Sequence, residues 1–391
     1  MADRLGDVNL RGSALLAVAV HHWCYGEVRE SADAGLRGGE LLRQTGNLWD
    51  FASGSNFVGT SLLALGRIDE SVKLWSESGP LASRLGHRPA SGVDFQVALL
   101  REGDIDAAEA YGRDALERLR SGEDDGTTWV ALAFLGAAHF LRGHWQDALA
   151  VFDEVTKVQP TGALAGHGEA FTVLVRAYMG DREKVHALLQ TKGVALPRRS
   201  AGAPASSPLL MVRAARASGL GVKGLLGILL ESRAMKNRGP LPRAGHPNPL
   251  GSWSTLFVAV EALAVLGEKS EAAKLYPLLQ EAMQMGVVIR GWDMRLLETL
   301  AGIAAGAGQD WPKAEEHFQT ALRRAEELPD LIEQPEARRF YARMLLDRNG
   351  PGDRETARGL LTEAIEMYRR IGMPKHLELT EKLLGEATAA Q

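Results

Sequence analysis

A histidine, a cysteine and a glutamate near the N-terminus have side chains that can bind a metal. The stretch His21-His-Trp-Cys-Tyr-Gly-Glu27 spaces His21, Cys24 and Glu27 three residues apart, on nearby faces of a helix. Zinc requires three or four converging ligands, usually from paired Cys and His residues. The chain has a single cysteine, which also disfavours a Cys/His nucleophile. We therefore predict that these residues pack the first helices rather than bind a metal.

A glycine pattern in the middle of the chain matches a nucleotide-binding motif. The segment Gly219-Leu-Gly-Val-Lys-Gly224 satisfies G-x-G-x-x-G. The dinucleotide mechanism requires a strand before this motif and a helix after it, whose N-terminus holds the pyrophosphate. The preceding sequence, 209–217, has the pattern of a helix. We therefore interpret Gly219 as the end of a helix and expect no cofactor there.

His139 is the remaining isolated candidate for catalysis. It lies in an apolar helical stretch, 129–142, where we interpret it as a packed core or groove residue. No pair of carboxylates stands out as general acid and base, and no G-x-x-x-x-G-K-[ST] loop is present. The sequence thus predicts no catalytic residue, no cofactor and no metal, and favours a protein that is not an enzyme.

A basic segment is the best candidate for binding. Residues 191–250 contain ten basic residues against the single acid Glu231, although the whole chain has a net charge of −4. The candidate partner-binding patch consists of Arg213, Arg216, Lys223, Arg233 and Lys236. No aromatic residue lies between Tyr178 and Trp253, which disfavours nucleic acid because bases would have no stacking platform. A solvated face is the preferred interpretation, and an acidic protein surface is the alternative.

Regularly spaced glycines indicate the elements that must position these residues. They recur every 37 to 48 residues, at Gly26, Gly66, Gly103, Gly143, Gly180, Gly219, Gly267, Gly308 and Gly352. A small or compact residue follows most of them by five positions, at Ser31, Ser71, Ala108, Ala148, Val185, Gly224, Ala272 and Ala357; after Gly308 the equivalent Ala314 comes one position late. The pattern predicts a helix, a turn at glycine, and a second helix that folds back closely.

The helical period within each unit extends this prediction to the whole chain. We expect helix pairs at about 10–46, 47–86, 88–121, 127–159, 163–191, 205–237, 252–285, 292–328 and 335–372, followed by a capping helix at about 375–389. Alternating β-branched runs are scarce, so strands are not expected. Proline-rich stretches at 195–208 and 238–249 suggest three regions: repeats at 1–191, a basic insertion with an irregular helix pair at 192–251, and repeats with the capping helix at 252–391.

The fourth unit resembles the tetratricopeptide (TPR) repeat. It has that repeat's order of Leu-Gly, turn glycine, aromatic, alanine, aromatic and proline, at Leu135, Gly136, Gly143, Trp145, Ala148, Phe152 and Pro160. Across the chain, the residues that define the repeat are Gly66, Gly103, Gly143, Gly180, Gly267, Ala108, Ala148, Ala272, Trp145 and Phe152. Most spacings exceed the 34 residues of a TPR. We expect an all-α, TPR-like solenoid of about nine antiparallel helix pairs, arranged as an irregular superhelix.

The composition is typical of a globular protein rather than a membrane protein. The chain has 391 residues, of which 45% are hydrophobic and 24% charged, which is typical of globular proteins. No apolar run reaches the length that spans a bilayer, and the first residues do not resemble a secretory leader. A lone cysteine, Cys24, excludes an internal disulfide framework. The expected location is the cytoplasm.

The C-terminal third contains several segments with a shared resemblance, at 301–305, 314–322, 326–329, 333–336, 341–348, 350–353 and 367–374. Together they resemble the tail of large bacterial signalling ATPases, most strongly over about 252–384. In that family a class III adenylate or guanylate cyclase domain, an AAA-like ATPase domain and a helical-repeat tail share one polypeptide. No catalytic residue of the cyclase or ATPase has a counterpart here.

The resemblance implies a non-catalytic regulatory module. We expect a protein or peptide partner in a concave groove of the superhelix, with cyclase or ATPase domains in cis or in trans. Two alternatives remain: the sensor tail of an ATPase-type transcriptional regulator, and, least favoured, a small-molecule enzyme built on a solenoid.

Overall fold

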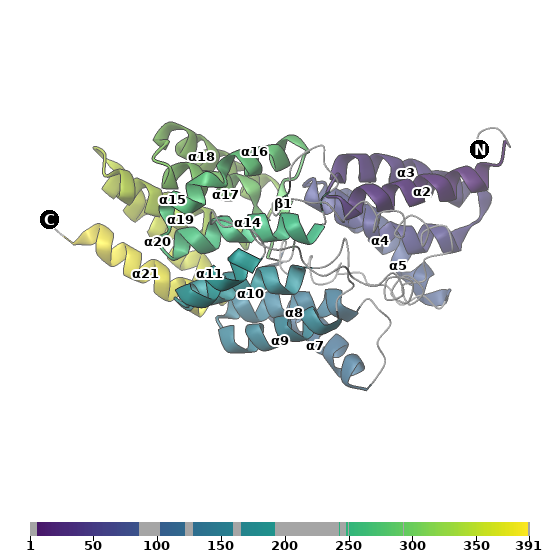
Figure 1. Ribbon diagram of the computed structural model, residues 1–391, viewed down its shortest axis with the longest axis horizontal. Coiled ribbons are helices and arrows are strands. Elements are labelled where there is room, and N and C mark those ends of the chain that lie inside the picture. Colours follow the sequence, from purple (N-terminus) through teal and green to yellow (C-terminus); the bar gives the residue numbers. More distant parts are fainter. Residues whose placement is uncertain are drawn as a thin grey trace.

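The all-α class that the sequence predicts is confirmed. The computed structural model describes residues 6–85, 102–121, 128–158, 166–191, 242, 248, 250–291 and 293–389. Within these residues helices account for nearly all regular structure, and the two ends of the chain lie at opposite ends of an elongated molecule (Figure 1). None of the described helices is long and apolar enough to cross a membrane.

The helices follow one another in closely connected runs. The first run is α2 (Val8–Cys24), α3 (Val28–Thr45), α4 (Leu48–Ala64) and α5 (Ile68–Arg84). The second is α7 (Ile105–Arg120), α8 (Thr128–Arg142), α9 (Trp145–Val158), α10 (His167–Tyr178) and α11 (Arg182–Thr191). The third begins with α14 (Leu250–Val265), α15 (Lys269–Lys274), α16 (Tyr276–Gln284), β1 (Ile289–Arg290) and β2 (Arg295–Leu296), and ends with α17 (Leu297–Ala307), α18 (Trp311–Glu327), α19 (Glu333–Arg348), α20 (Asp353–Ile371) and α21 (Pro374–Thr388).

Left-handed glycines lie just before second helices at the expected places. The five repeat-defining glycines have φ between +64° and +79°, a backbone region that residues with a Cβ seldom adopt; they are Gly66, Gly103, Gly143, Gly180 and Gly267. The small residues that follow them in the second helices are completely buried, as at Ala108, Ala148 and Ala272. Gly219 and Gly224 lie outside the described residues.

One predicted turn position is wrong by a single residue. Gly308 has φ −82°, and the left-handed residue is its neighbour Gln309, at φ +61°. Ala314 is fully buried five residues after Gln309, so this unit keeps the usual distance from turn to buried alanine. The position of the turn therefore follows the packing of the alanine rather than the presence of glycine.

A second regularity links a glycine to an aromatic ring sixteen residues later. A Cβ added to Gly59 would lie 2.3 Å from Nε1 of Trp75, and one at Gly136 would lie 2.7 Å from the ring of Phe152. A Cβ at Gly302 would likewise approach the ring of Phe318 to 3.0 Å. All three rings are buried. In these three units the first helix, α4, α8 or α17, thus has a glycine against which an aromatic side chain of the partner helix packs.

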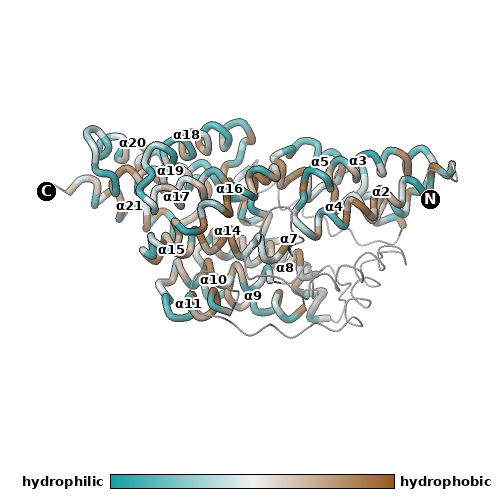
Figure 2. The backbone as a smooth tube through the Cα atoms, turned by 45° about the horizontal axis from the view of Figure 1, so that its top comes forward, coloured by the Kyte–Doolittle hydropathy of each residue, from teal (hydrophilic) through white to brown (hydrophobic). Residues whose placement is uncertain are grey.

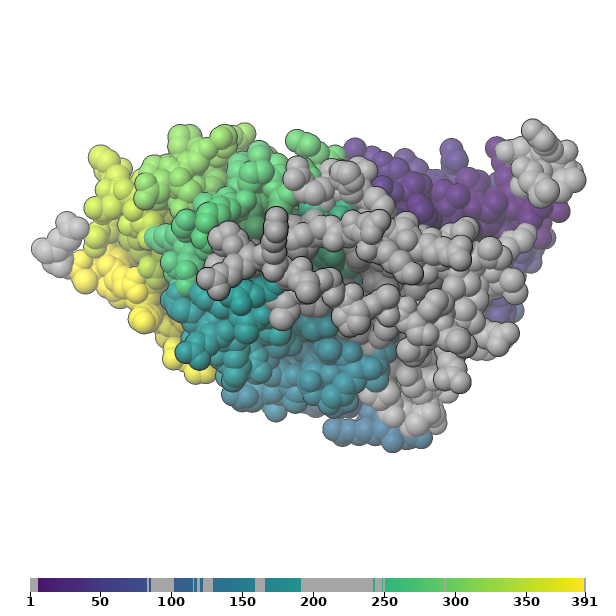
Figure 3. All heavy atoms as spheres, in the orientation of Figure 1, coloured from purple at the N-terminus to yellow at the C-terminus, as the bar shows by residue number. Residues whose placement is uncertain are grey.

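The runs also contact one another out of sequence order. The amide of Val288 donates to the carbonyl of Ala64 at 2.7 Å, and Trp253 Nε1 donates to the carbonyl of Tyr25 at 3.2 Å, so the first run docks directly on the third. Helix α8 contacts α21, and α10 packs on α14. In Figure 3 the second run, in teal, lies directly against the third run, in green and yellow. In an open solenoid each repeat contacts only its neighbours. The described helices instead close on one another.

Helix α14 lies at the centre of this arrangement. It is hydrophobic along most of its length (Figure 2) and contacts α10 and α17. One apolar cluster contains buried residues from both sides of the segment 192–249, from Val28 to Ala387. The helices that flank the basic segment therefore share a core.

Two local departures from the predicted helices occur between α14 and α17. Residues Ile289–Arg290 and Arg295–Leu296 form a two-stranded antiparallel sheet, although strands were not expected. Strands of two residues are too short to produce an alternating pattern in the sequence. The second helix of this unit is also divided at Leu275, immediately before the Tyr276-Pro277 start of α16, because proline fits the first turn of a helix but not its interior.

Gly180 and Gly359 form a matched pair for testing the turn. A Cβ at either position would meet no atom within 4 Å, but Gly180 has φ +77° whereas Gly359 lies inside α20. We expect Gly180→Ala to lower the free energy of unfolding by about 1 kcal/mol and Gly359→Ala to raise it by about 0.5–1 kcal/mol. Urea denaturation of both variants measures this, and the same sign for both would contradict it.

Candidate functional site

The basic patch predicted for partner binding lies outside the described residues. Arg213, Arg216, Lys223, Arg233 and Lys236 therefore stay a prediction from sequence.

The N-terminal metal candidate is not assembled. Cys24 is buried, and His22, rather than His21, contacts Glu27, with 2.6 Å between His22 Nδ1 and Glu27 Oε2. In the part of the chain that the structure describes, one group of three metal-binding side chains has its donor atoms within 4.8 Å of one another: Glu109, His139 and His144. From sequence we interpret His139 as a packed core or groove residue, without a link to Glu109 or His144.

The aromatic residues of the fourth unit occupy structural positions. Phe152 is completely buried and stacks on Phe171, with 5.5 Å between ring centroids. Trp145 is half-buried and meets the edge of Tyr178 at 6.0 Å. These rings join α9 to α10, as expected of residues that define a repeat.

The main feature that the sequence did not reveal is a buried ionic network. It combines three arginines, four carboxylates and several polar groups from α10, α14, both strands, α17, α19, α20 and α21. Its members are Tyr178, Glu261, Arg290, Asp293, Arg295, Thr299, Glu333, Glu336, Arg339, Tyr368 and His376. All are at least nine-tenths buried. Burial of so many charges is tolerated only when each is paired and hydrogen-bonded.

Arg295, on β2, is the centre of the network. Its guanidinium donates to both oxygens of Glu261, at 3.0 and 3.1 Å, and to Glu333 and Glu336, each at 2.8 Å. The same group lies 5.6 Å from the centre of the Phe340 ring. One side chain of a two-residue strand thus joins α14 to α19.

Arg290 and Arg339 extend the network to either side. Arg290 donates to Glu261 at 2.8 Å and forms a bidentate pair with Asp293, which closes the turn between the strands. Arg339 donates to Glu336 at 2.6 Å and to the Tyr178 hydroxyl of α10 at 2.8 Å.

Glu336 also connects the last two helices. It accepts from the Tyr368 hydroxyl of α20 at 2.7 Å and contacts Nδ1 of His376, on α21, at 2.6 Å. The carboxylate of one α19 residue thereby fixes the C-terminal helices.

The carboxyl groups have widely separated pKa values. Burial opposes ionisation of Glu261, but Arg295 and Arg290 lower its pKa to about 2. The pKa of Glu336 also lies well below its usual range, because Arg339 and Arg295 outweigh burial. At Glu333 burial outweighs Arg295 and raises the pKa to about 7, and burial raises the pKa of Asp330 well above its usual value. With Glu333 protonated, three carboxylates balance three guanidinium groups.

The burial of the network defines its role. Its side chains Tyr178, Glu261, Glu336 and His376 belong to α10, α14, α19 and α21 and are joined by hydrogen bonds in the interior of the protein. Because they are buried, they cannot receive a partner or a substrate in this conformation. The network fixes the relative positions of helices from both sides of the segment 192–249.

One sequence signal could have located it. Glu261 is the only charged residue of α14, within the run Leu256-Phe-Val-Ala-Val-Glu-Ala-Leu263. An acid that interrupts a long apolar helix requires a buried cationic partner. The identity of that partner depends on β1 and β2, which the sequence did not indicate.

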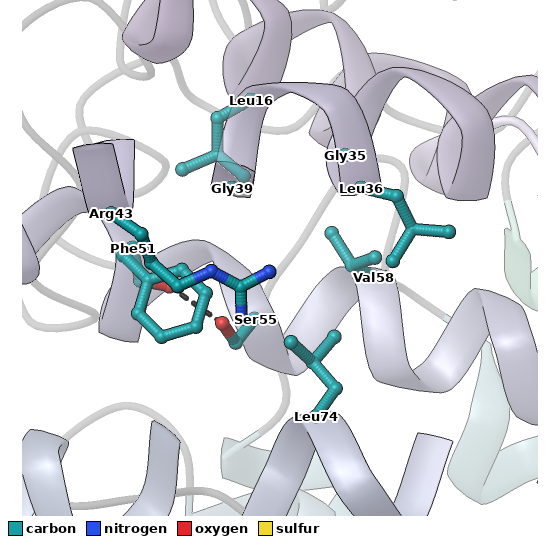
Figure 4. A pocket seen from close by; sticks show the side chains of 9 residues that line it. All are labelled: Leu16, Gly35, Leu36, Gly39, Arg43, Phe51, Ser55, Val58 and Leu74. Carbon is teal, nitrogen blue, oxygen red and sulfur yellow. Dashed lines mark hydrogen bonds between the residues drawn. The ribbon is translucent and has the colours of Figure 1, made fainter. Parts of the chain in front are cut away.

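An apolar pocket opens in the first run of helices. Its lining residues come from α2, α3, α4 and α5: Leu16, Gly35, Leu36, Gly39, Arg43, Phe51, Ser55, Val58 and Leu74 (Figure 4). The Arg43 guanidinium lies over the Phe51 ring, 4.9 Å from its centre, and donates to Glu77 at 2.7 Å. The cavity has a volume of about 10 Å³, which is room for about one water molecule, so it is a shallow apolar depression rather than a small-molecule site.

Comparison with protein-family models and with curated proteins found no match for this chain.

Proposed function

We propose that this chain is a TPR-like helical-repeat module that binds a protein partner and has no catalytic centre of its own. The observation that carries the proposal is the recurring unit itself: a left-handed turn and a buried small residue five positions later, together with a glycine that packs against an aromatic ring sixteen positions on in three of the units. Repeated helical hairpins of this kind serve mainly as binding surfaces.

The pocket of α2–α5 is the proposed point of attachment. The inner side chains of α10, α14, α19 and α21 are occupied by the buried network, so the concave groove expected from sequence is not accessible there. The pocket of the first run is a shallow apolar depression bordered by Arg43, which is paired with Glu40 and Glu77. We expect an apolar side chain of the partner to lie against this depression rather than enter it.

The resemblance of residues 252–384 supports a place in signal transduction. We propose that the partner is a cyclase or ATPase domain, in cis or in trans, and that the module acts in the cytoplasm as a regulatory tail. A sensor tail of a transcriptional regulator is the alternative from sequence.

The pocket can be tested by changing one half-buried residue of its wall. Leu36→Asp places a carboxylate beside the apolar base, so capture of the partner from native lysate should fall at least tenfold, because a charge cannot be desolvated there without a partner. Mass spectrometry identifies the retained proteins, and a cyclase assay on them tests the proposed partner class.

Val18→Asp is the matched control. Val18 is 43% exposed and lies two positions from the lining residue Leu16, on the opposite face of α2. Both variants should retain the helical circular dichroism of the parent. Equal capture by Leu36→Asp and the parent chain would overturn the pocket as the attachment point.

A further inference from the structure

Glu109, His139 and His144 bring one carboxylate and two imidazoles together at the meeting point of three helices. Glu109 lies in the second turn of α7, His139 in the last turn of α8, and His144 directly before α9. Their donor atoms lie within 4.8 Å of one another. This donor set is typical of zinc sites with three protein ligands.

The turn between α8 and α9 fixes the two histidines relative to each other. The amide of His144 donates to the carbonyl of His139 at 2.9 Å, and the amide of Gly143 donates to that of Phe140 at 3.0 Å. With Gly143 at φ +79°, these two bonds form a Schellman motif. The backbone positions of His139 and His144 are therefore set by the fold, and α7 packs along α8 to supply Glu109.

His139 has an orphaned nitrogen that faces the carboxylate. Its Nδ1 is buried and has no hydrogen-bond partner, although Glu109 Oε1 lies 3.3 Å away. Ligands of a tetrahedral zinc ion, each about 2.0–2.2 Å from the metal, are about 3.3–3.6 Å apart. The separation of these two atoms thus equals one edge of a zinc coordination tetrahedron.

Two of the three ligands are shielded from solvent, since the side chains of Glu109 and His139 are only 6% and 13% exposed. Arg113 currently pairs with Glu109, but its side chain is 63% exposed and can turn into solvent. His144 is exposed, so an ion can enter from that side.

We propose that Glu109, His139 and His144 bind one zinc ion, which joins α7 to the turn between α8 and α9 and keeps at least one coordination position for water or a partner's donor atom. The inference is independent of the pocket of α2–α5. The zinc ion gives the buried Nδ1 of His139 a partner, and it links α7 to α8 and α9.

The test uses metal-free full-length protein and zinc alone. Isothermal titration should show one equivalent of zinc bound to the parent chain. His144→Ala changes only an exposed side chain and should weaken binding at least tenfold, as should Glu109→Gln. When cobalt replaces zinc, the parent should show the visible absorption of a four-coordinate cobalt site. Zinc should also raise the Tm of the parent more than it raises the Tm of His144→Ala.

His22→Ala is the matched control, because His22 pairs with Glu27 but belongs to no group of three donor atoms within 4.8 Å of one another among the described residues. Its zinc affinity should equal that of the parent. No binding by the parent, or equal affinity of the parent and His144→Ala, would overturn the proposal.

Discussion

Replacing Arg295 by methionine should lower the free energy of unfolding by about 3–5 kcal/mol, which is the usual effect of removing one partner from a buried ion pair. Methionine keeps much of the volume of the side chain but leaves the Glu261 and Glu336 carboxylates without their shared cation. Urea denaturation followed by circular dichroism measures the change.

Arg343→Met provides the control within the same group of helices. Arg343 pairs with Glu386 at 3.0 Å, but both side chains are more than two-fifths exposed. Exposed pairs contribute about 0–1 kcal/mol, so this variant should be nearly as stable as the parent. Similar losses for the two variants would show that the network does not hold the C-terminal helices together.

Glu333→Gln should become more stable relative to the parent as the pH rises from 5 to 8. Burial raises the pKa of Glu333 to about 7 in the folded protein, from an ordinary value of 4.5. Between these values the folded chain retains a proton that the unfolded chain has released, so rising pH destabilises the parent. The relative gain should reach about 3 kcal/mol, since each unit of pKa corresponds to about 1.4 kcal/mol.

The pH dependence of stability must be compared between Glu333→Gln and the parent, because other groups also change the stability of the parent with pH. Burial lowers the pKa of His167 to about 4, so this residue makes the fold more stable as the pH rises through 4 to 6.5, opposite in sign to Glu333. Glu261 and Glu336 have lowered pKa values, so their contributions to the stability of the fold are lost only as the pH falls below about 4.5. Both the parent and Glu333→Gln contain these groups.

Glu327→Gln is the control for this prediction, because Glu327 is an exposed residue at the end of α18. Its stability should run parallel to the parent at every pH. A parallel profile for Glu333→Gln as well would contradict the raised pKa of Glu333.

In the part of the chain that the structure describes, sequence periodicity located most helices because their signals are local. The predicted ranges 10–46 and 127–159 correspond to α2–α3 and α8–α9, since helical period and turn glycine are both properties of a few adjacent residues. The all-α class follows directly. The turn at Gln309 escaped detection because a non-glycine residue adopted the left-handed conformation.

The sites depended on contacts between distant segments, which periodicity does not encode. Arg339 of α19 reaches Tyr178 of α10 across 161 positions, and Glu109 of α7 lies 3.3 Å from His139 of α8. A buried charge such as Glu261 indicates that a partner exists, but only the three-dimensional arrangement identifies it. The tertiary closure of the helices likewise has no local signal.

The most direct test of the proposed function is photo-crosslinking from the pocket in cells. A benzophenone amino acid replaces Leu36 in one variant and Val18, on the opposite face of α2, in another. A specific adduct from position 36 alone, with the same protein that affinity capture retains, is the predicted result. No adduct at position 36, or the same adducts from both positions, would contradict binding of a partner through the pocket.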